Sequence, residues 1–102
     1  MIKVTIVRHN NSINEIEIEG HAGSGPKGHD LVCAAISAII TGGANALPNQ
    51  KNYEVVLESG HASIKMKQFD EDGNKVLNTV WVMLKTVEES NSKFIRIYEK
   101  EN

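Results

Sequence analysis

The chain is poor in cysteine, proline and aromatic residues, with one cysteine, two prolines and 5% aromatics among 102 residues. A single cysteine cannot form an intramolecular disulfide, which is typical of proteins from a reducing cytoplasm. Long apolar runs are also missing, because the longest, residues 31–40, is interrupted by Ser37 and is too short to cross a bilayer. Residues 1–20 alternate in polarity and carry no secretory signal. We therefore expect a cytoplasmic protein with no membrane span.

No charge of one sign dominates, since 11 Lys and Arg residues oppose 13 Asp and Glu residues for a formal net charge of −2. This balance argues against a large basic surface, so we expect no direct binding to nucleic acid. The content of 40% hydrophobic and 24% charged residues is close to the average for globular proteins. The sequence contains no repeat, low-complexity segment or linker, so residues 1–102 are predicted to form a single domain.

Apolar periodicity predicts a mixture of strands and helices. Residues 2–8 and 13–19 alternate in polarity around a turn-rich segment, which predicts a hairpin. After Asp30, a good N-cap, residues 31–47 are apolar nearly all the way round, which predicts a buried helix. The remaining elements are expected as strands at 53–58, 62–68 and 93–99 and a helix at 74–90. The order ββαββαβ predicts an α+β, two-layer domain with two helices packed on a mostly antiparallel sheet, and it leaves the strand order open.

Several polar or aromatic residues outside the central segment have simple structural interpretations. His9 lies in the hairpin turn and is expected to be exposed. His61 begins a strand and is expected to be structural, with lining of the site as the lesser alternative. Trp81 on the second helix is predicted to lie in the core or in an interface. The acidic run at residues 70–72 is predicted to be a solvated loop.

The segment at residues 20–40, GHAGSGPKGHDLVCAAISAII, contains the one cysteine and two of the four histidines. Three roles for Cys33 fit this position: a core residue, a metal ligand or a nucleophile. A lone cysteine in an apolar helix is most often a small core residue. A metal site would use His21, His29 and Cys33, but it lacks a fourth ligand and any zinc-type spacing. We therefore predict neither a metal nor another cofactor.

The nucleophile interpretation depends on the helix start and on a nearby imidazole. With Asp30 as the N-cap, Cys33 is an early helical residue, where the helix dipole and unpaired N–H groups stabilise a thiolate and an oxyanion. His21 ends the preceding strand, and a glycine-rich loop can bring it back to the thiol as the base. His29 is a second candidate for the base. Ser37 lies one turn after Cys33 and can hydrogen-bond near the thiol. The glycines match no phosphate-binding pattern and fit a flap beside a site better.

The pattern GHA, a glycine-rich loop and GxDxVCAAxSA, here GHAGSGPKGHDLVCAAISA, resembles the ribosomal-processing cysteine protease (Prp) family. The resemblance extends over essentially the full chain, including the paired N-terminal strands and the central helix with Asn45-Ala46. It implies a cysteine endopeptidase in which Cys33 is the nucleophile and His21 is the catalytic histidine. The family pattern does not require a histidine at His29, so the base role is not given to it.

The same resemblance implies further site residues. Asp30 and Ser37 fall on the family's Asp and Ser and are expected to assist the reaction. The loop between the histidine and the cysteine is expected to be mobile and to close on a bound peptide. Its glycines Gly23, Gly25 and Gly28 are therefore the expected substrate-binding residues.

The resemblance also implies a substrate and an assembly. The expected substrate is the N-terminal extension of a large-subunit ribosomal protein, number twenty-seven in that series, and the expected assembly is a homodimer. The alternative from another class is a non-catalytic binding or assembly factor associated with the ribosome, in which Cys33 only fills space.

Overall fold

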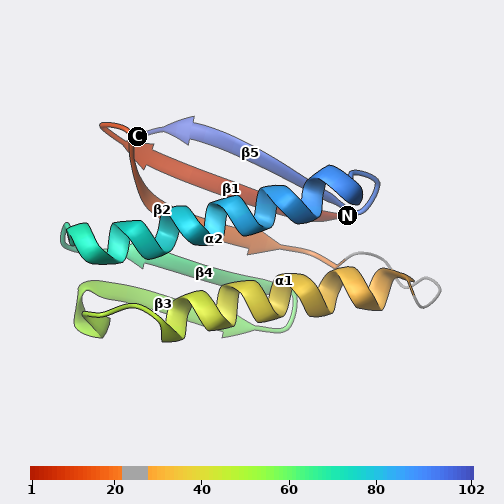
Figure 1. Cartoon of the computed structure of the whole chain (residues 1–102), viewed down its shortest axis with the longest axis horizontal. Helices are drawn as coiled ribbons and strands as arrows, with labels where there is room; N and C mark the ends of the chain where they lie inside the picture. Colours follow the sequence, from red (N-terminus) through yellow and green to blue (C-terminus); the bar gives the residue numbers. More distant parts are fainter. Residues whose placement is uncertain (22–27) are drawn as a thin grey trace.

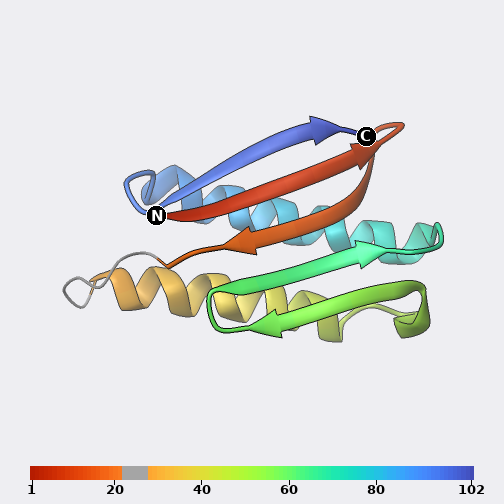
Figure 2. The ribbon, with the colours of Figure 1, turned by 180° about the vertical axis from the view of Figure 1, so that it is seen from behind.

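The computed structural model describes the backbone of residues 1–21 and 28–102, and the side chains of residues 1–21 and 31–102. Five strands form one sheet in the order β3-β4-β2-β1-β5, and both helices cover the same face of it (Figures 1 and 2). The elements are β1 (Ile2–His9), β2 (Ser12–Glu19), α1 (Gly28–Asn45), a short 3-10 turn (Gln50–Asn52), β3 (Tyr53–Glu58), β4 (His61–Met66), α2 (Glu71–Ser90) and β5 (Ile95–Glu101). The predicted α+β class and the order ββαββαβ are confirmed.

The sheet is antiparallel except where its last strand joins it. Strand β1 pairs antiparallel with β2, and β4 pairs antiparallel with both β2 and β3. Strand β5 lies parallel to β1, in a register that places Ile2 beside Ile95. A parallel pair needs a crossover connection, and α2 supplies it. The sequence pattern contained no information on this order, because the pairing partner of a strand is decided by the fold of the distant parts of the chain.

The predicted hairpin forms around a turn that only certain residues tolerate. Asn10 and Asn11 have positive φ angles of 50° and 69°. Asparagine adopts this left-handed conformation more readily than most residues, so the two asparagines fix the turn. The turn sets a register in which Val4 faces Ile18 and Ile6 faces Ile16 across the two strands.

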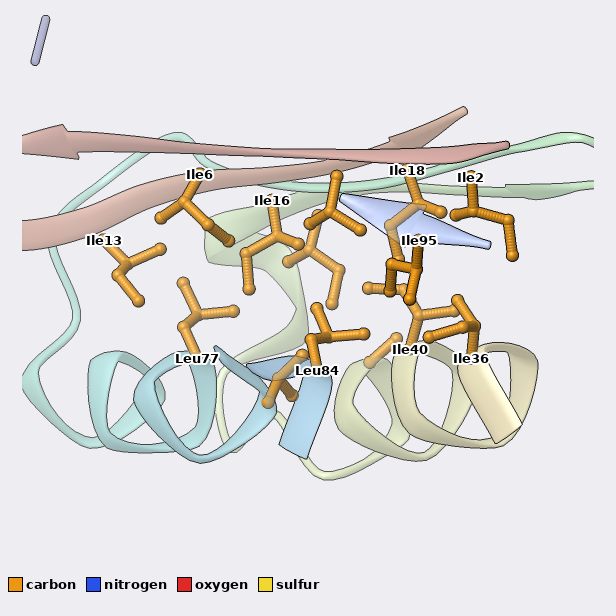
Figure 3. Packing of buried hydrophobic residues seen from close by; sticks show 14 of the residues in the cluster. Ile2, Ile6, Ile13, Ile16, Ile18, Ile36, Ile40, Leu77, Leu84 and Ile95 are labelled. Carbon is orange, nitrogen blue, oxygen red and sulfur yellow. The ribbon is translucent and has the colours of Figure 1, made fainter. Parts of the chain in front are cut away.

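The core lies between the sheet and the two helices and consists mostly of branched aliphatic side chains. Figure 3 shows isoleucines of β1, β2 and β5 pointing down onto Ile36 and Ile40 of α1 and Leu77 and Leu84 of α2. Ile6, Ile16 and Ile64 are fully buried. Because strand side chains alternate between faces, the polar partners of these residues lie on the uncovered side of the sheet. Within the described residues, neither helix is long and apolar enough to cross a membrane.

Helix α1 differs from the prediction in its start and in its burial. It begins at Gly28, so Asp30 lies inside its first turn, and the prediction that Asp30 is the N-cap is wrong. An aspartate favours either position, because both lie close to the unpaired N–H groups of a helix start. One face of α1 is exposed, with Leu31 at 73% exposure, so the predicted all-round burial is also wrong. A two-layer fold covers a helix on one side only.

Helix α2 begins earlier than predicted, because Asp70 is its N-cap. The side chain of Asp70 is 9% exposed, and its two oxygens accept hydrogen bonds from the Tyr53 hydroxyl and the Asn49 amide, each at 3.1 Å. The prediction of a solvated loop at residues 70–72 is therefore wrong. Glu71 and Asp72 are exposed, but they form the first turn of α2, where acidic residues favour the helix dipole.

Candidate active site

His21 follows the end of β2 and is held through its backbone by two neighbouring segments. Gly20 has a φ of +91°, which turns the chain out of the strand. The N–H of Gly20 donates a hydrogen bond to the carbonyl oxygen of Gly60 at 2.9 Å. The carbonyl oxygen of His21 in turn accepts a hydrogen bond from the N-terminal ammonium of Met1 at 2.8 Å. The start of β1 and the β3–β4 turn therefore fix the backbone position of His21, while its side chain stays exposed.

Cys33 lies in the second turn of α1, on the edge of the buried face. Val32 and Ile36 are buried at 5% and 4% exposure and anchor this part of the helix on the sheet. Cys33 itself is half-buried and packs against the core from its rim. A cysteine that only fills the core would be fully buried, whereas this thiol lies between core and solvent. Because α1 begins at Gly28, Cys33 is also further from the positive end of the helix dipole than the sequence indicated.

A pocket of about 220 Å³ brings the predicted residues together. His21, Cys33 and Ser37 all line it, although they come from the end of β2 and from two successive turns of α1. Its floor consists of apolar side chains of the core, among them Ile18 and Ile36. The pocket therefore combines an imidazole, a thiol and a hydroxyl on an apolar base, which suits nucleophilic chemistry with a proton acceptor.

A larger pocket, of about 400 Å³, lies near the β1–β2 turn, with His9, Met66 and Phe69 among its lining residues. It contains no thiol and none of the predicted site residues. Volume alone is therefore a poor guide to the active site in this fold, and the chemistry of the lining residues decides.

Other predicted site residues are placed only in part. Gly28 is the first residue of α1, and Asp30 lies in the first turn, but the side chain of Asp30 is outside the described part of the structure. Gly23 and Gly25 lie outside the described residues altogether. Among the side chains of residues 1–21 and 31–102, no group of three His, Cys, Asp or Glu residues could hold a metal ion.

Apart from the lesser alternative given for His61, the sequence interpretation missed the β3–β4 turn, which forms one wall of the pocket through residues 58–62. His61 belongs to this wall. Its Nε2 lies 3.4 Å from Glu17 Oε2 and its Nδ1 lies 4.0 Å from Glu58 Oε1. Two carboxylates therefore lie beside the His61 ring, one from β2 and one from β3. The only sequence signal for this wall was the Ser-Gly-His turn between two predicted strands, which does not indicate its distance from Cys33.

Comparison with known proteins gives a consistent result. A family model described as Cysteine protease Prp matches residues 1–96. The chain is 34% identical to the ribosomal processing cysteine protease Prp of Staphylococcus aureus strain Mu50, over 98% of this chain and 100% of that protein. A crystal structure of an essential ribosomal processing protease Prp from S. aureus, in complex with a covalently linked product peptide, matches with a TM-score of 0.84. That match has 32% sequence identity and covers 98% of this chain and 100% of the other.

A second crystal structure from S. aureus, of the same type of protease in complex with a substrate peptide, matches with a TM-score of 0.83 and 30% identity over 98% of this chain and 100% of that chain. Sequence and fold thus agree over nearly the full length, and the pocket contains a thiol and an imidazole. The chain therefore belongs to the Prp family of cysteine proteases.

Proposed function

We propose that this protein is an endopeptidase that removes the N-terminal extension of large-subunit ribosomal protein number twenty-seven, with Cys33 as nucleophile and His21 as general base. The observation that carries the proposal is that these two residues line one pocket. The relatives support the choice of substrate class, since the S. aureus proteins are named ribosomal processing proteases and have been crystallised with substrate and product peptides. Membership of a protease family favours this function over a non-catalytic assembly factor.

The proposed reaction follows thiol protease chemistry. His21 accepts the proton of the Cys33 thiol, and the thiolate attacks the carbonyl carbon of the scissile peptide bond. The tetrahedral intermediate collapses when the imidazolium gives its proton to the leaving amine, which leaves a thioester on Cys33. A water molecule, deprotonated by His21, then attacks the thioester and releases the new carboxylate and the thiol. N–H groups in the first turn of α1, which lack partners within the helix, are candidates to stabilise the oxyanion.

The remaining expectations belong to the same proposal. Ser37 lines the pocket and assists near the thiol, and Asp30 assists from the first turn of α1. The loop with Gly23, Gly25 and Gly28 contacts the bound peptide. The chain acts as one catalytic domain in the cytoplasm, without a cofactor and without direct contact to nucleic acid. Homodimer formation is part of the same proposal, and the exposed Leu31 of α1 is a candidate contact between the two copies.

The test is incubation of the purified protein with the extended ribosomal protein, followed by mass spectrometry of the products. We expect one cut that separates the extension from the mature protein. Cys33→Ser and His21→Ala should leave the precursor intact while their circular dichroism matches that of the wild type. An uncut precursor with the wild type, or a normal cut with Cys33→Ser, would contradict the proposal.

A further inference from the structure

The β3–β4 turn lies directly against the imidazole of His21. A Cβ atom built on Gly60 would lie 2.8 Å from His21 Nε2, 3.2 Å from Cε1 and 3.7 Å from Cδ2. Protein Cβ atoms essentially never approach other heavy atoms more closely than 3.0 Å. The ring of His21 therefore occupies space that a side chain at position 60 would need. All three distances are to ring atoms, so a side chain at position 60 would meet the imidazole of His21 itself.

The same turn also fixes the backbone next to this ring. The carbonyl oxygen of Gly60 accepts the hydrogen bond from the N–H of Gly20, at 2.9 Å. A Cβ on Gly20 would lie 2.7 Å from the carbonyl oxygen of Met1, so the chain is also tightly packed on this side. His21 is thus held at its backbone through Gly20, and its ring lies against Gly60. The two contacts come from one residue of the turn.

We propose that Gly60 is the positioning residue for His21, because its missing side chain lets the imidazole lie against the β3–β4 turn, inside the pocket that contains Cys33. The inference rests on the proposed function, in which His21 is the base. Proton transfer requires the ring within hydrogen-bond reach of the sulfur, and misplacement by about 1 Å can cost about a hundredfold in rate. A side chain at position 60 displaces the ring without removing it.

A second property of Gly60 must be separated from this role. Its φ is +77°, which is strained for most residues, and this alone can account for a glycine in the turn. Asparagine tolerates positive φ better than other residues, as Asn10 and Asn11 do in this chain, but it still carries a Cβ. Gly60→Asn therefore tests the contact with the imidazole while it limits the strain of the turn.

The experiment is a double-mutant cycle with Gly60→Asn and His21→Ala, and Gly42→Ala is the matched glycine control. A Cβ on Gly42 would meet no atom within 4 Å. The measurements are kcat and KM on the extended precursor, the rate of Cys33 alkylation by iodoacetamide, and thermal unfolding. We expect Gly60→Asn to lower kcat by about a hundredfold while KM stays within about threefold, and Gly42→Ala to cleave at the wild-type rate. Gly60→Asn should slow the alkylation of Cys33 when His21 is present. In the His21→Ala background, Gly60→Asn should leave the alkylation rate unchanged.

Stability provides a readout that does not depend on activity. The contact predicts that Gly60→Asn lowers the melting temperature more when His21 is present than in the His21→Ala background, where no ring opposes the new Cβ. If Gly60→Asn folds only in the His21→Ala background, the contact is supported in the same way. Misfolding or equal destabilisation in both backgrounds would show that the glycine serves the turn alone and would overturn the inference.

The result also separates this inference from the proposed function. A wild type that leaves the precursor uncut, or an active His21→Ala variant, would refute the proposed dyad. An active wild type, an inactive His21→Ala and a fully active Gly60→Asn would leave the dyad in place and refute the positioning role of Gly60.

Discussion

Gly43 of α1 packs so closely on Val80 of α2 that a Cβ atom at Gly43 would overlap the Cγ2 atom of Val80. Gly43 is buried, whereas its neighbour Gly42 is exposed and has open space around it. The two helices can approach at this point only because the first of them has no side chain there. The contact sets the position of α1 on the sheet and, through the helix, the position of Cys33.

The pair of adjacent glycines gives a prediction for stability. Gly43→Ala should lower the free energy of unfolding by about 1–3 kcal/mol, because the added methyl group overpacks the helix interface. Gly42→Ala should raise it by about 0.5–1 kcal/mol, because alanine is the better helix former and meets no neighbour. Urea unfolding followed by circular dichroism measures both. Equal effects of the two substitutions would show that the helices do not touch at Gly43.

The four histidines of the chain predict a selective effect on catalysis. His21→Ala should lower kcat for precursor cleavage by about a hundredfold or more, because the thiol loses its proton acceptor. The matched control is His9→Ala, since His9 is also exposed but lies at the far end of β1. Both variants should keep the wild-type melting temperature within a few degrees. A loss of activity in His9→Ala as large as in His21→Ala would contradict this assignment.

An ion pair between β1 and β5 predicts a loss of stability in acid. The Nε of Arg8 donates a hydrogen bond to Glu99 Oε1 at 2.8 Å, and the Nε1 of Trp81 donates to Oε2 at 3.2 Å. The hydrogen bond from Arg8 is the main reason that the pKa of Glu99 lies below its ordinary value. Because the pKa of Glu99 is lower in the folded state, the ion pair contributes to the free energy of unfolding above the ordinary pKa of glutamate. This contribution is lost as the pH falls through the pKa of Glu99 in the folded state.

The measurement is the free energy of unfolding of the wild type and of Glu99→Gln between neutral pH and pH 3, with Glu101→Gln as an exposed control on the same strand. The wild type should be more stable at neutral pH, and the difference should shrink on acidification. A difference between wild type and Glu99→Gln that is constant with pH would count against the ion pair as its source.

The buried pair of Tyr53 and Asp70 predicts the alkaline behaviour. Burial is the first cause that raises the pKa of Tyr53 well above its ordinary value, and the hydrogen bond to Asp70 and the charge of Asp70 add to it. A raised pKa means that the stability contribution is present below the ordinary tyrosine pKa of about 10 and is lost as the pH rises above it. In Tyr98→Phe, Tyr53 is the one remaining tyrosine. Its phenolate absorbance should appear only together with unfolding, and titration near pH 10 in a folded protein would argue against the pair.

The sequence predicted most of the elements but few of the contacts between them. Alternating isoleucines in residues 13–19 identified β2, because one face of that strand is buried and the other is not. The start of α2 was predicted too late, because Asp70 looks like a loop residue in sequence, whereas in the fold its carboxylate accepts hydrogen bonds from Tyr53 and Asn49. Such a site depends on residues that are distant along the chain.

In the candidate site, too, the sequence indicated the residues but not the contacts between them. A lone thiol and a histidine on either side of a glycine-rich loop indicated the two residues that now line one pocket. Nothing in the sequence indicated that Gly60 lies against His21, because this contact depends on the antiparallel pairing of β2 with β4. Local sequence patterns therefore predict the reactive groups, whereas the residues that position them are determined by the sheet topology.

The hydrogen bond from the ammonium of Met1 to the carbonyl oxygen of His21 has a practical consequence for handling the protein. The two ends of the chain lie at opposite ends of the parallel β1–β5 pair (Figure 1). An affinity tag fused ahead of Met1 turns that charged donor into a neutral amide right beside the pocket. A tag after Asn102 avoids this, and assays with recombinant material should use the latter arrangement.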